Sequence, residues 1–223
     1  MDTKLFFETI GKFIFGIIIV GLLIFLPAGS LNYWNGWLFA GILFIPMFIV
    51  GIAMMFKSPD LLRSRLNARE KESEQKEVVL YSGLMFLVGF IVAGLNYRYD
   101  WIDIPNVIVI IGSCLFILSY LLYAEVLREN VFLSRTIEVQ KEQKVISTGL
   151  YGIVRHPMYA ITIILFLSIP LILGSLISFV IFLVYPFIII KRINNEEKVL
   201  EKELKGYKDY KNKVKYKLIP FIW

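Results

Sequence analysis

The sequence is poor in the residues that most often carry enzyme chemistry. Its 223 residues include one cysteine, Cys114, and one histidine, His156. A single cysteine cannot form an intrachain disulfide, and these two residues with a pair of adjacent glutamates do not make a zinc site. We therefore expect no disulfide framework and no bound metal. The sequence also offers no credible Ser–His–Asp or Cys–His set, and no glycine-rich nucleotide loop after a strand, because no strand is predicted.

Charge is missing from long stretches of the chain. Hydrophobic residues make up 57% of the sequence and the mean hydropathy is +0.69, whereas soluble proteins are roughly 45–50% apolar. This composition excludes disorder and collagen-like repeats, and a soluble protein with so much apolar surface would aggregate. Five apolar stretches account for this excess of hydrophobic residues: residues 13–26, 37–56, 78–95, 107–124 and 158–190. We therefore predict an all-α integral membrane protein.

The fifth stretch is too long for one membrane-spanning helix. Its 33 residues contain no charge, and as a single helix they would extend about 50 Å, against a hydrocarbon core of about 30 Å. Leu173-Gly174-Ser175 near its middle favours a turn. We therefore expect a tight hairpin over residues 158–190, and about six transmembrane helices in total. Residues 1–124 are expected to form the first four, and residues 125–223 a region with a loop, the hairpin, a cytoplasmic carboxyl-terminal helix and a tail.

The positions of the basic residues predict the orientation in the membrane. The chain has 24 Lys and Arg against 18 Asp and Glu, a net charge of +6. If six helices alternate in direction, every basic residue except Arg98 falls on one side, which the positive-inside rule makes cytoplasmic. We therefore expect both termini in the cytoplasm. The positive charge then reflects topology rather than nucleic-acid binding, and the charged loop over residues 57–76 is expected to be a solvated helix at the membrane edge.

The hairpin returns the chain to the face that it left, so two polar segments should meet there. Arg155-His156-Pro157 enters the first arm, and Lys191 to Glu197 leaves the second. Polar clusters at a membrane boundary are candidate functional sites. Each segment also has a structural interpretation: Pro157 suits the first turn of a helix, and Glu196-Glu197 could open an amphipathic surface helix.

Three motifs resemble one enzyme family. Residues 149–159 (GLYGIVRHPMY) are similar to the signature of the isoprenylcysteine carboxyl methyltransferase family, which belongs to a wider group with phospholipid methyltransferases. Residues 128–138 (RENVFLSRTIE) resemble its bacterial members. The carboxyl-terminal part contributes a third set, formed by Arg192, Glu196, Glu197, Leu200, Gly206, Tyr207, Tyr210, Leu218, Ile219 and Pro220. Leu150 departs from the family pattern, which usually has proline there.

The resemblance implies a membrane methyltransferase that uses S-adenosylmethionine and has no Rossmann domain. The residues that it implies for the cofactor pocket are Gly149, Tyr151, Val154, Arg155, His156, Pro157, Tyr159, Glu196 and Glu197. Arg192 and Glu196 are the residues expected nearest the methyl transfer, hence catalytic. The acceptor is expected to be the carboxylate of a prenylated or other lipophilic substrate that enters from the bilayer among the membrane lipids.

Three alternatives remain open from the sequence. The first is a phospholipid amine methyltransferase with the same cofactor, for which a general base such as Glu197 or His156 would be needed. The second is an NADPH-dependent sterol-type reductase, which has a similar Arg-His-Pro segment. The third is a non-catalytic membrane protein such as a small transporter or scaffold.

Overall fold

The computed structural model describes residues 3–66, 73–133 and 139–223. Within these ranges the chain is helical and contains no strand, which confirms the predicted all-α class. Residues 67–72 of the charged loop and residues 134–138 of the second motif lie outside the described residues. The helices are α1 (Thr3–Ala28), α2 (Trp34–Lys57), α3 (Pro59–Leu66), α4 (Ser73–Tyr99), α5 (Asn106–Glu129), η1 (Gly149–Gly152), α6 (Pro157–Ile172), α7 (Leu176–Phe182), α8 (Tyr185–Glu203) and α9 (Tyr207–Lys213).

Five segments among the described residues are long and apolar enough to cross a membrane. They are Thr3–Ala28, Trp34–Lys57, Gln75–Tyr99, Asn106–Glu129 and Leu176–Glu203, and α6 is a sixth, shorter apolar helix. The 16 residues of α6 span about 24 Å, less than the hydrocarbon core of about 30 Å. The predicted set of about six membrane helices is therefore present, with one short arm, as expected for a 33-residue stretch folded in two.

The predicted hairpin turn lies at Leu173-Gly174-Ser175, between α6 and α7. Gly174 has a φ of +70°, a conformation that residues with a Cβ rarely adopt. Ser175 caps α7 by accepting a hydrogen bond from the Ser178 N–H at 3.2 Å. The first turn of α2 holds this turn in place, because the Asn35 side-chain amide donates a hydrogen bond to the Ile172 carbonyl at 2.8 Å.

The second arm of the hairpin differs in detail from the prediction. It breaks after Phe182 and resumes as α8, which then continues past Ile190 to Glu203 without interruption. Glu196 and Glu197 thus lie in the interior of α8, so the interpretation that they open a separate surface helix is wrong. The strong helix formers Lys, Glu and Leu extend the apolar arm into its charged continuation. The separate carboxyl-terminal helix, α9, begins only after Gly206, which has a φ of +87°.

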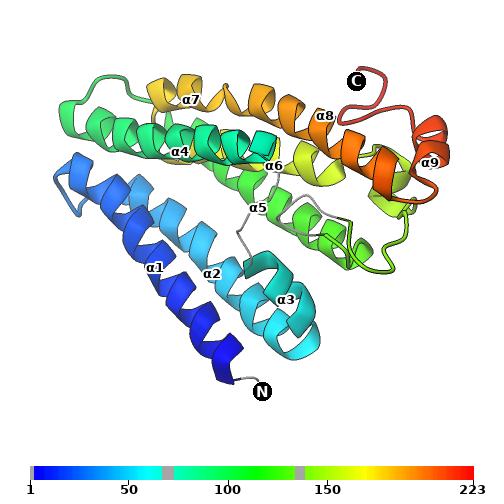
Figure 1. Cartoon of the computed structure of the whole chain (residues 1–223). Coiled ribbons are helices and arrows are strands. Elements are labelled where there is room, and N and C mark those ends of the chain that lie inside the picture. Colours follow the sequence, from blue (N-terminus) through cyan, green and yellow to red (C-terminus); the bar gives the residue numbers. More distant parts are fainter. Residues whose placement is uncertain (1–2, 67–72, 134–138) are drawn as a thin grey trace.

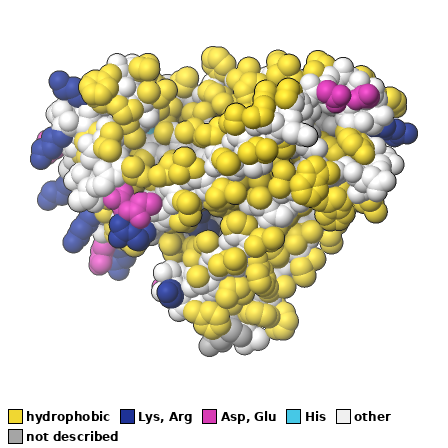
Figure 2. All heavy atoms as spheres, turned by 180° about the vertical axis from the view of Figure 1, so that it is seen from behind, with side chains coloured by type: hydrophobic (Ala, Val, Ile, Leu, Met, Phe, Trp, Pro, Cys, Tyr) yellow, Lys and Arg dark blue, Asp and Glu magenta, His cyan; other side chains and the backbone are white. Residues whose placement is uncertain are grey.

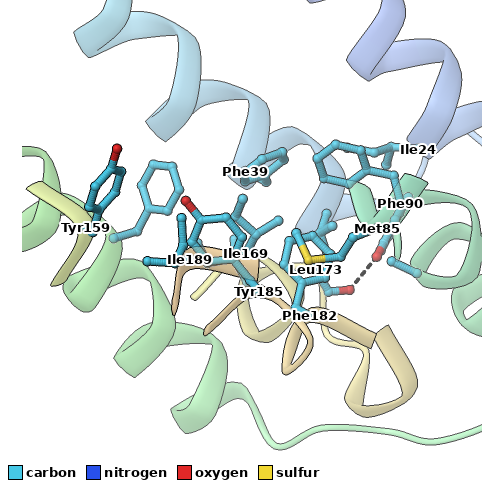
Figure 3. Packing of buried hydrophobic residues seen from close by; sticks show 14 of the residues in the cluster. Ile24, Phe39, Met85, Phe90, Tyr159, Ile169, Leu173, Phe182, Tyr185 and Ile189 are labelled. Carbon is cyan, nitrogen blue, oxygen red and sulfur yellow. Dashed lines mark hydrogen bonds between the residues drawn. The ribbon is translucent and has the colours of Figure 1, made fainter. Parts of the chain in front are cut away.

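A buried aromatic and aliphatic cluster holds the helices together. Phe39 of α2, Phe90 of α4, Phe116 of α5 and Phe182 of α7 are all buried in it. Figure 3 shows labelled side chains of α2, α4, α6, α7 and α8 converging on this cluster. Because α6 packs against α5, and α7 and α8 pack against α4, the hairpin is held against the preceding helices.

Charged side chains gather at one end of the molecule. The turns that join α1 to α2, α4 to α5 and α6 to α7 lie at one end in Figure 1, and α3, α9 and the carboxyl terminus lie toward the other. Figure 2 shows a wide hydrophobic surface, with most of the visible Lys and Arg side chains at the α9 end. This separation is the one that the positive-inside prediction requires. Within the charged loop of residues 57–76, Pro59–Leu66 form the short helix α3, and the described residues 73–76 already belong to α4.

Candidate active site

The two polar segments that flank the hairpin meet at its open end. Residues 149–156 lie before α6, and α8 passes beside them on its way to Glu203. The segment after α9 closes the arrangement, because the Tyr216 and Lys217 carbonyls accept hydrogen bonds from the backbone N–H groups of Arg155 and His156, both at 2.9 Å. Residues far apart in the sequence are therefore fixed against one another by backbone as well as side-chain contacts.

A chain of hydrogen bonds joins Arg192, Tyr159 and Glu196. The Tyr159 hydroxyl donates to Glu196 Oε2 at 2.6 Å and accepts from Arg192 Nε at 2.8 Å. The Arg192 guanidinium also lies 5.8 Å from the centre of the Tyr159 ring, a favourable position for a cation. Helix α4 supports the arginine, because Arg192 Nη1 donates to Gln75 Oε1 at 3.3 Å. Tyr159 therefore sets the relative positions of a guanidinium and a carboxylate.

A second cluster is centred on the buried carboxylate of Glu197. Its Oε1 accepts from Arg155 Nε at 2.7 Å and lies 3.2 Å from His156 Nε2, and Lys217 Nζ lies 3.4 Å from Oε2. Arg155 Nη1 also donates to the Val214 and Lys215 carbonyls, both at 2.7 Å. Because Arg155 and Glu197 are both buried, this pair ties the loop before α6, α8 and the final segment together.

A pocket lies between these clusters and the loop that follows α5. It encloses about 810 Å³ of empty space, part of it open to solvent. Its wall is formed by Asn130, Phe132, Leu133, Gln143, Lys144, Val145, Ile146, Tyr151, Arg155, His156, Met158, Tyr159, Arg192, Glu196, Leu200, Leu204, Tyr207 and Tyr210. Charges of both signs, four tyrosines and several apolar side chains thus face one space.

The tyrosine hydroxyls of this wall remain protonated at neutral pH. Burial raises the pKa of Tyr151 to about 12, although Asn130 donates to its hydroxyl at 3.1 Å. Burial, followed by the charges of Glu197 and Glu196, raises the pKa of Tyr207 well above its ordinary value. The Tyr207 hydroxyl is buried and has no hydrogen-bond partner in the described part of the protein. Since buried polar atoms are nearly always hydrogen-bonded, this hydroxyl is an exception among the described residues.

The predicted site residues divide into two groups in the structure. Six of them line the pocket: Tyr151, Arg155, His156, Tyr159, Arg192 and Glu196. The other four lie behind its wall: Gly149, Val154, Pro157 and Glu197. Glu197 forms the buried cluster described above, Val154 is buried, and Pro157 occupies the first turn of α6.

Gly149 supports the wall from outside. It has a φ of +51°, and a Cβ at this position would lie 1.4 Å from Glu129 Oε1. The Glu129 carboxylate instead accepts a hydrogen bond from the Leu150 N–H at 3.1 Å. Only glycine therefore allows Glu129 to cap this loop, which carries Tyr151 into the pocket.

The structure adds pocket residues that the sequence did not assign to the site. Tyr207 and Tyr210 project from α9, and the Tyr210 hydroxyl donates to the Tyr151 carbonyl at 2.7 Å. Their spacing of three residues places them on one face of a helix. This spacing is the sequence pattern that could have indicated both tyrosines as site residues. Leu200 and Leu204, four residues apart at the end of α8, have a same-face spacing too, and Asn130 and Leu200 stand in the motifs quoted above. Among the described residues, no group of three His, Cys, Asp or Glu side chains could hold a metal ion.

Comparisons with known proteins connect this site to an enzyme family. Residues 107–206 match the family described as phospholipid methyltransferase. No curated protein sequence matches the chain significantly. The fold is similar to that of a eukaryotic intramembrane Ras methyltransferase, isoprenylcysteine carboxyl methyltransferase, with a TM-score of 0.55 and 18% identity over 98% of this chain and 85% of that one.

The matched region begins at α5 and ends before α9, so it contains most of the pocket wall. The sequence match confirms the predicted resemblance to this wider group, and the structural match confirms the predicted membrane fold. Residues 107–206 therefore resemble the phospholipid methyltransferase family, and the fold as a whole resembles that of a membrane methyltransferase.

Proposed function

We propose that the protein transfers a methyl group from S-adenosylmethionine to the carboxylate of a prenylated or other lipophilic substrate. The observation that carries the proposal is the Arg192–Tyr159–Glu196 chain in the wall of a pocket that opens at the charged end of a membrane bundle. The name of the structural relative, a carboxyl methyltransferase, supports the choice of acceptor group.

The residues present fit the proposed methyl donor. S-adenosylmethionine would supply an activated methyl group, together with an ammonium, a carboxylate and an adenosine. Glu196 can accept hydrogen bonds from an ammonium or from ribose hydroxyls, and Arg155 presents positive charge for a carboxylate. The Tyr207 hydroxyl, which has no partner among the described residues, offers a hydrogen bond, and the tyrosine rings suit an adenine face and a cationic centre.

A carboxylate acceptor suits this site because it needs no strong general base. A carboxyl group is already ionised at pH 7, so the protein has to bind, orient and desolvate it. Arg192, held by Tyr159 and Gln75, is placed to orient a carboxylate. Tyr159 fixes the distance between that guanidinium and Glu196.

Amine methylation is the second candidate function, and the matched family's description favours it. Removal of a proton from an amine would require a base within reach of the pocket. Among the described residues, Glu196 is the carboxylate that lines the pocket. If the acceptor is an amine, loss of the Glu196 charge should therefore abolish transfer to it.

We also propose that both termini and the pocket face the cytoplasm, with residues 125–223 as the catalytic region. The basic residues at the α9 end support this orientation. The acceptor would then enter sideways from the cytoplasmic leaflet. A lipid acceptor explains why the site is built on membrane helices.

The test measures binding of S-adenosylmethionine to the detergent-purified protein and labelled methyl transfer to two acceptors. These are an S-farnesylcysteine derivative with a free carboxylate and phosphatidylethanolamine. Arg192→Gln and Glu196→Gln should each reduce transfer to the carboxylate at least about tenfold. Lys198→Gln and Glu203→Gln, at exposed positions of the same helix, should leave it unchanged. Absence of donor binding by the wild type would refute the proposal.

A further inference from the structure

The segment after α9 carries a small cluster of exposed apolar side chains. Residues 213–223 (KVKYKLIPFIW) join a stretch of alternating lysines to an uncharged stretch. Three side chains of the uncharged stretch form what is called the apolar tip below: Ile219 is 51% exposed, Phe221 is 87% exposed and Ile222 is 77% exposed. Because neighbouring apolar side chains are rarely left in water, such a cluster marks a contact surface.

The backbone around the apolar tip is fixed by hydrogen bonds. The Trp223 main-chain oxygen accepts from the N–H groups of Lys217, Leu218 and Ile219 at 2.9, 2.9 and 3.1 Å. Phe221, inside this turn, has a φ of +66°, which bulky residues rarely adopt and which persists only where the surrounding structure fixes it. Leu218 and Trp223 pack against the core of the helix bundle. The turn therefore presents the apolar tip outward.

Lys217 fixes the position of this turn along α8. Its ammonium donates to Asn194 Oδ1 at 2.7 Å and lies 4.7 Å from the centre of the Trp223 ring. Figure 1 shows the carboxyl-terminal segment beside α8. Phe187, Ile190 and Asn194 are three and four residues apart, so they lie on one face of α8. Since Phe187 and Ile190 are exposed apolar residues, the turn lies at the end of a lipid-facing stripe.

This position corresponds to the headgroup region of a bilayer. Helix α8 changes from apolar to charged residues after Ile190, so the edge of the hydrocarbon core lies near that residue. Asn194 is four residues further, about 6 Å along the helix axis. The headgroup region extends about 5–8 Å beyond the core. Aromatic side chains and the long stems of lysines are favoured at this depth.

The segment that carries the apolar tip also holds two residues of the pocket. The Tyr216 and Lys217 carbonyls accept hydrogen bonds from the backbone N–H groups of Arg155 and His156. Arg155 and His156 both line the pocket. A contact that fixes the apolar tip therefore also fixes one side of the pocket wall.

We propose that the apolar tip is an interfacial anchor, which inserts among the lipid headgroups at the α9 end of the bundle and holds residues 214–217 against the pocket. The partner is the bilayer surface, because the tip continues the lipid-facing stripe of α8. Burial of its apolar side chains favours insertion, and the neighbouring lysines lie at the depth of the lipid phosphates. The methyl acceptor takes no part in this contact, so the inference goes beyond the proposed function.

Quenching by spin-labelled lipid measures whether the apolar tip is inserted. A polarity-sensitive fluorophore is attached to Phe221→Cys, Phe187→Cys or Lys208→Cys, each in the full-length protein with Cys114→Ser, in phosphatidylcholine nanodiscs. The quencher is phosphatidylcholine with a nitroxide near the carboxyl end of one acyl chain. Position 221 should be quenched as strongly as position 187 on the apolar part of α8, and position 208, exposed on α9, only weakly. Equally weak quenching at 221 and 208, as expected if the tip contacts a protein or a second copy of the chain instead, would overturn the inference.

Hydrogen exchange tests the link between the apolar tip and the pocket. In nanodiscs, peptides that cover Arg155 and His156 should exchange faster in the double variant Phe221→Ser/Ile222→Ser than in the wild type. Asn212→Ser, at an exposed position of α9, should exchange as the wild type does. Unchanged exchange in the double variant would refute the link. Neither assay contains a methyl donor or acceptor, so both outcomes are independent of the proposed function.

Discussion

Arg155, before α6, and Glu197, on α8, form a buried ion pair in which Nε lies 2.7 Å from Oε1. The two residues are 42 positions apart, and the hairpin of α6, α7 and α8 brings them together. Arg155 in turn binds the carbonyls of Val214 and Lys215. The pair therefore joins both ends of the hairpin to the segment that closes the pocket.

Glu197→Gln should destabilise the protein strongly. The change leaves the Arg155 guanidinium buried without a counter-charge, and removal of one partner of a buried pair costs about 3–5 kcal/mol. Thermal unfolding in detergent measures the loss. Glu201→Gln is the matched control, because Glu201 pairs with Lys211 at a partly exposed site, where a pair contributes about 0–1 kcal/mol. Equal unfolding temperatures for the two variants would show that the buried pair does not hold the region together.

Tyr207→Phe should separate ligand binding from stability. The Tyr207 hydroxyl is buried without a partner in the described residues, so its removal should leave the ligand-free protein as stable as before or more stable. Binding of S-adenosylmethionine should weaken. Tyr210→Phe should do the opposite for stability, because it removes the hydrogen bond to the Tyr151 carbonyl, worth about 1 kcal/mol. Calorimetric titration beside thermal unfolding gives both readouts, and unchanged donor affinity in Tyr207→Phe would contradict the assignment.

Gly94→Ala should disturb the contact between α1 and α4. A Cβ on Gly94 would lie 2.6 Å from the Ile24 carbonyl oxygen and 2.9 Å from the Ala28 nitrogen, so the two backbones would have to separate. We expect a lower unfolding temperature. Gly83→Ala in the same helix has open space around it and should be neutral or slightly stabilising, because alanine favours helix over glycine by about 1 kcal/mol. The same stability in both variants would rule out close packing at Gly94.

The proposed orientation can be tested by labelling introduced cysteines. Cys114 is the chain's single cysteine, so a Cys114→Ser background carries no other thiol. Asp103, between α4 and α5, and Lys213, at the end of α9, are both exposed. A membrane-impermeant maleimide should label Asp103→Cys in intact cells. It should label Lys213→Cys only after the membrane is opened. The reverse pattern would place the pocket outside the cell.

The sequence was sufficient to predict the helical class, the hairpin and its turn. The 33-residue uncharged stretch exceeds the membrane thickness, and Gly174 supplies the positive φ that the turn requires. The predicted return of the chain to one face is what places Arg155, His156, Tyr159, Arg192 and Glu196 at a common pocket. Spacing along the chain could not distinguish Glu196, which lines the pocket, from Glu197, which lies behind it. That difference is set by which face of α8 meets the loop before α6.

Other parts of the site depend on tertiary contacts that no local pattern reveals. The charged loop of residues 57–76 was expected to be a solvated helix at the membrane edge, yet its Arg65 contacts Tyr123 of α5, 58 positions away. No local pattern shows that the Tyr207 hydroxyl is buried in the pocket wall with no hydrogen-bond partner among the described residues. The sequence did not predict that α8 continues beyond Ile190, because the change from apolar to charged residues there resembles a helix end, although the Lys, Glu and Leu residues that follow favour a helix.

The most direct test of the account is the transfer of labelled methyl from S-adenosylmethionine to a farnesylcysteine carboxylate by the wild type and by Tyr159→Phe. Tyr159→Phe keeps the ring and removes both hydrogen bonds that position Arg192 and Glu196. Hydrogen bonds to charged groups contribute about 1.5–3 kcal/mol each, so transfer should fall by at least about tenfold. The product of the wild type should release labelled methanol in alkali, as an ester does. Alkali-stable label, or full activity in Tyr159→Phe, would contradict the account.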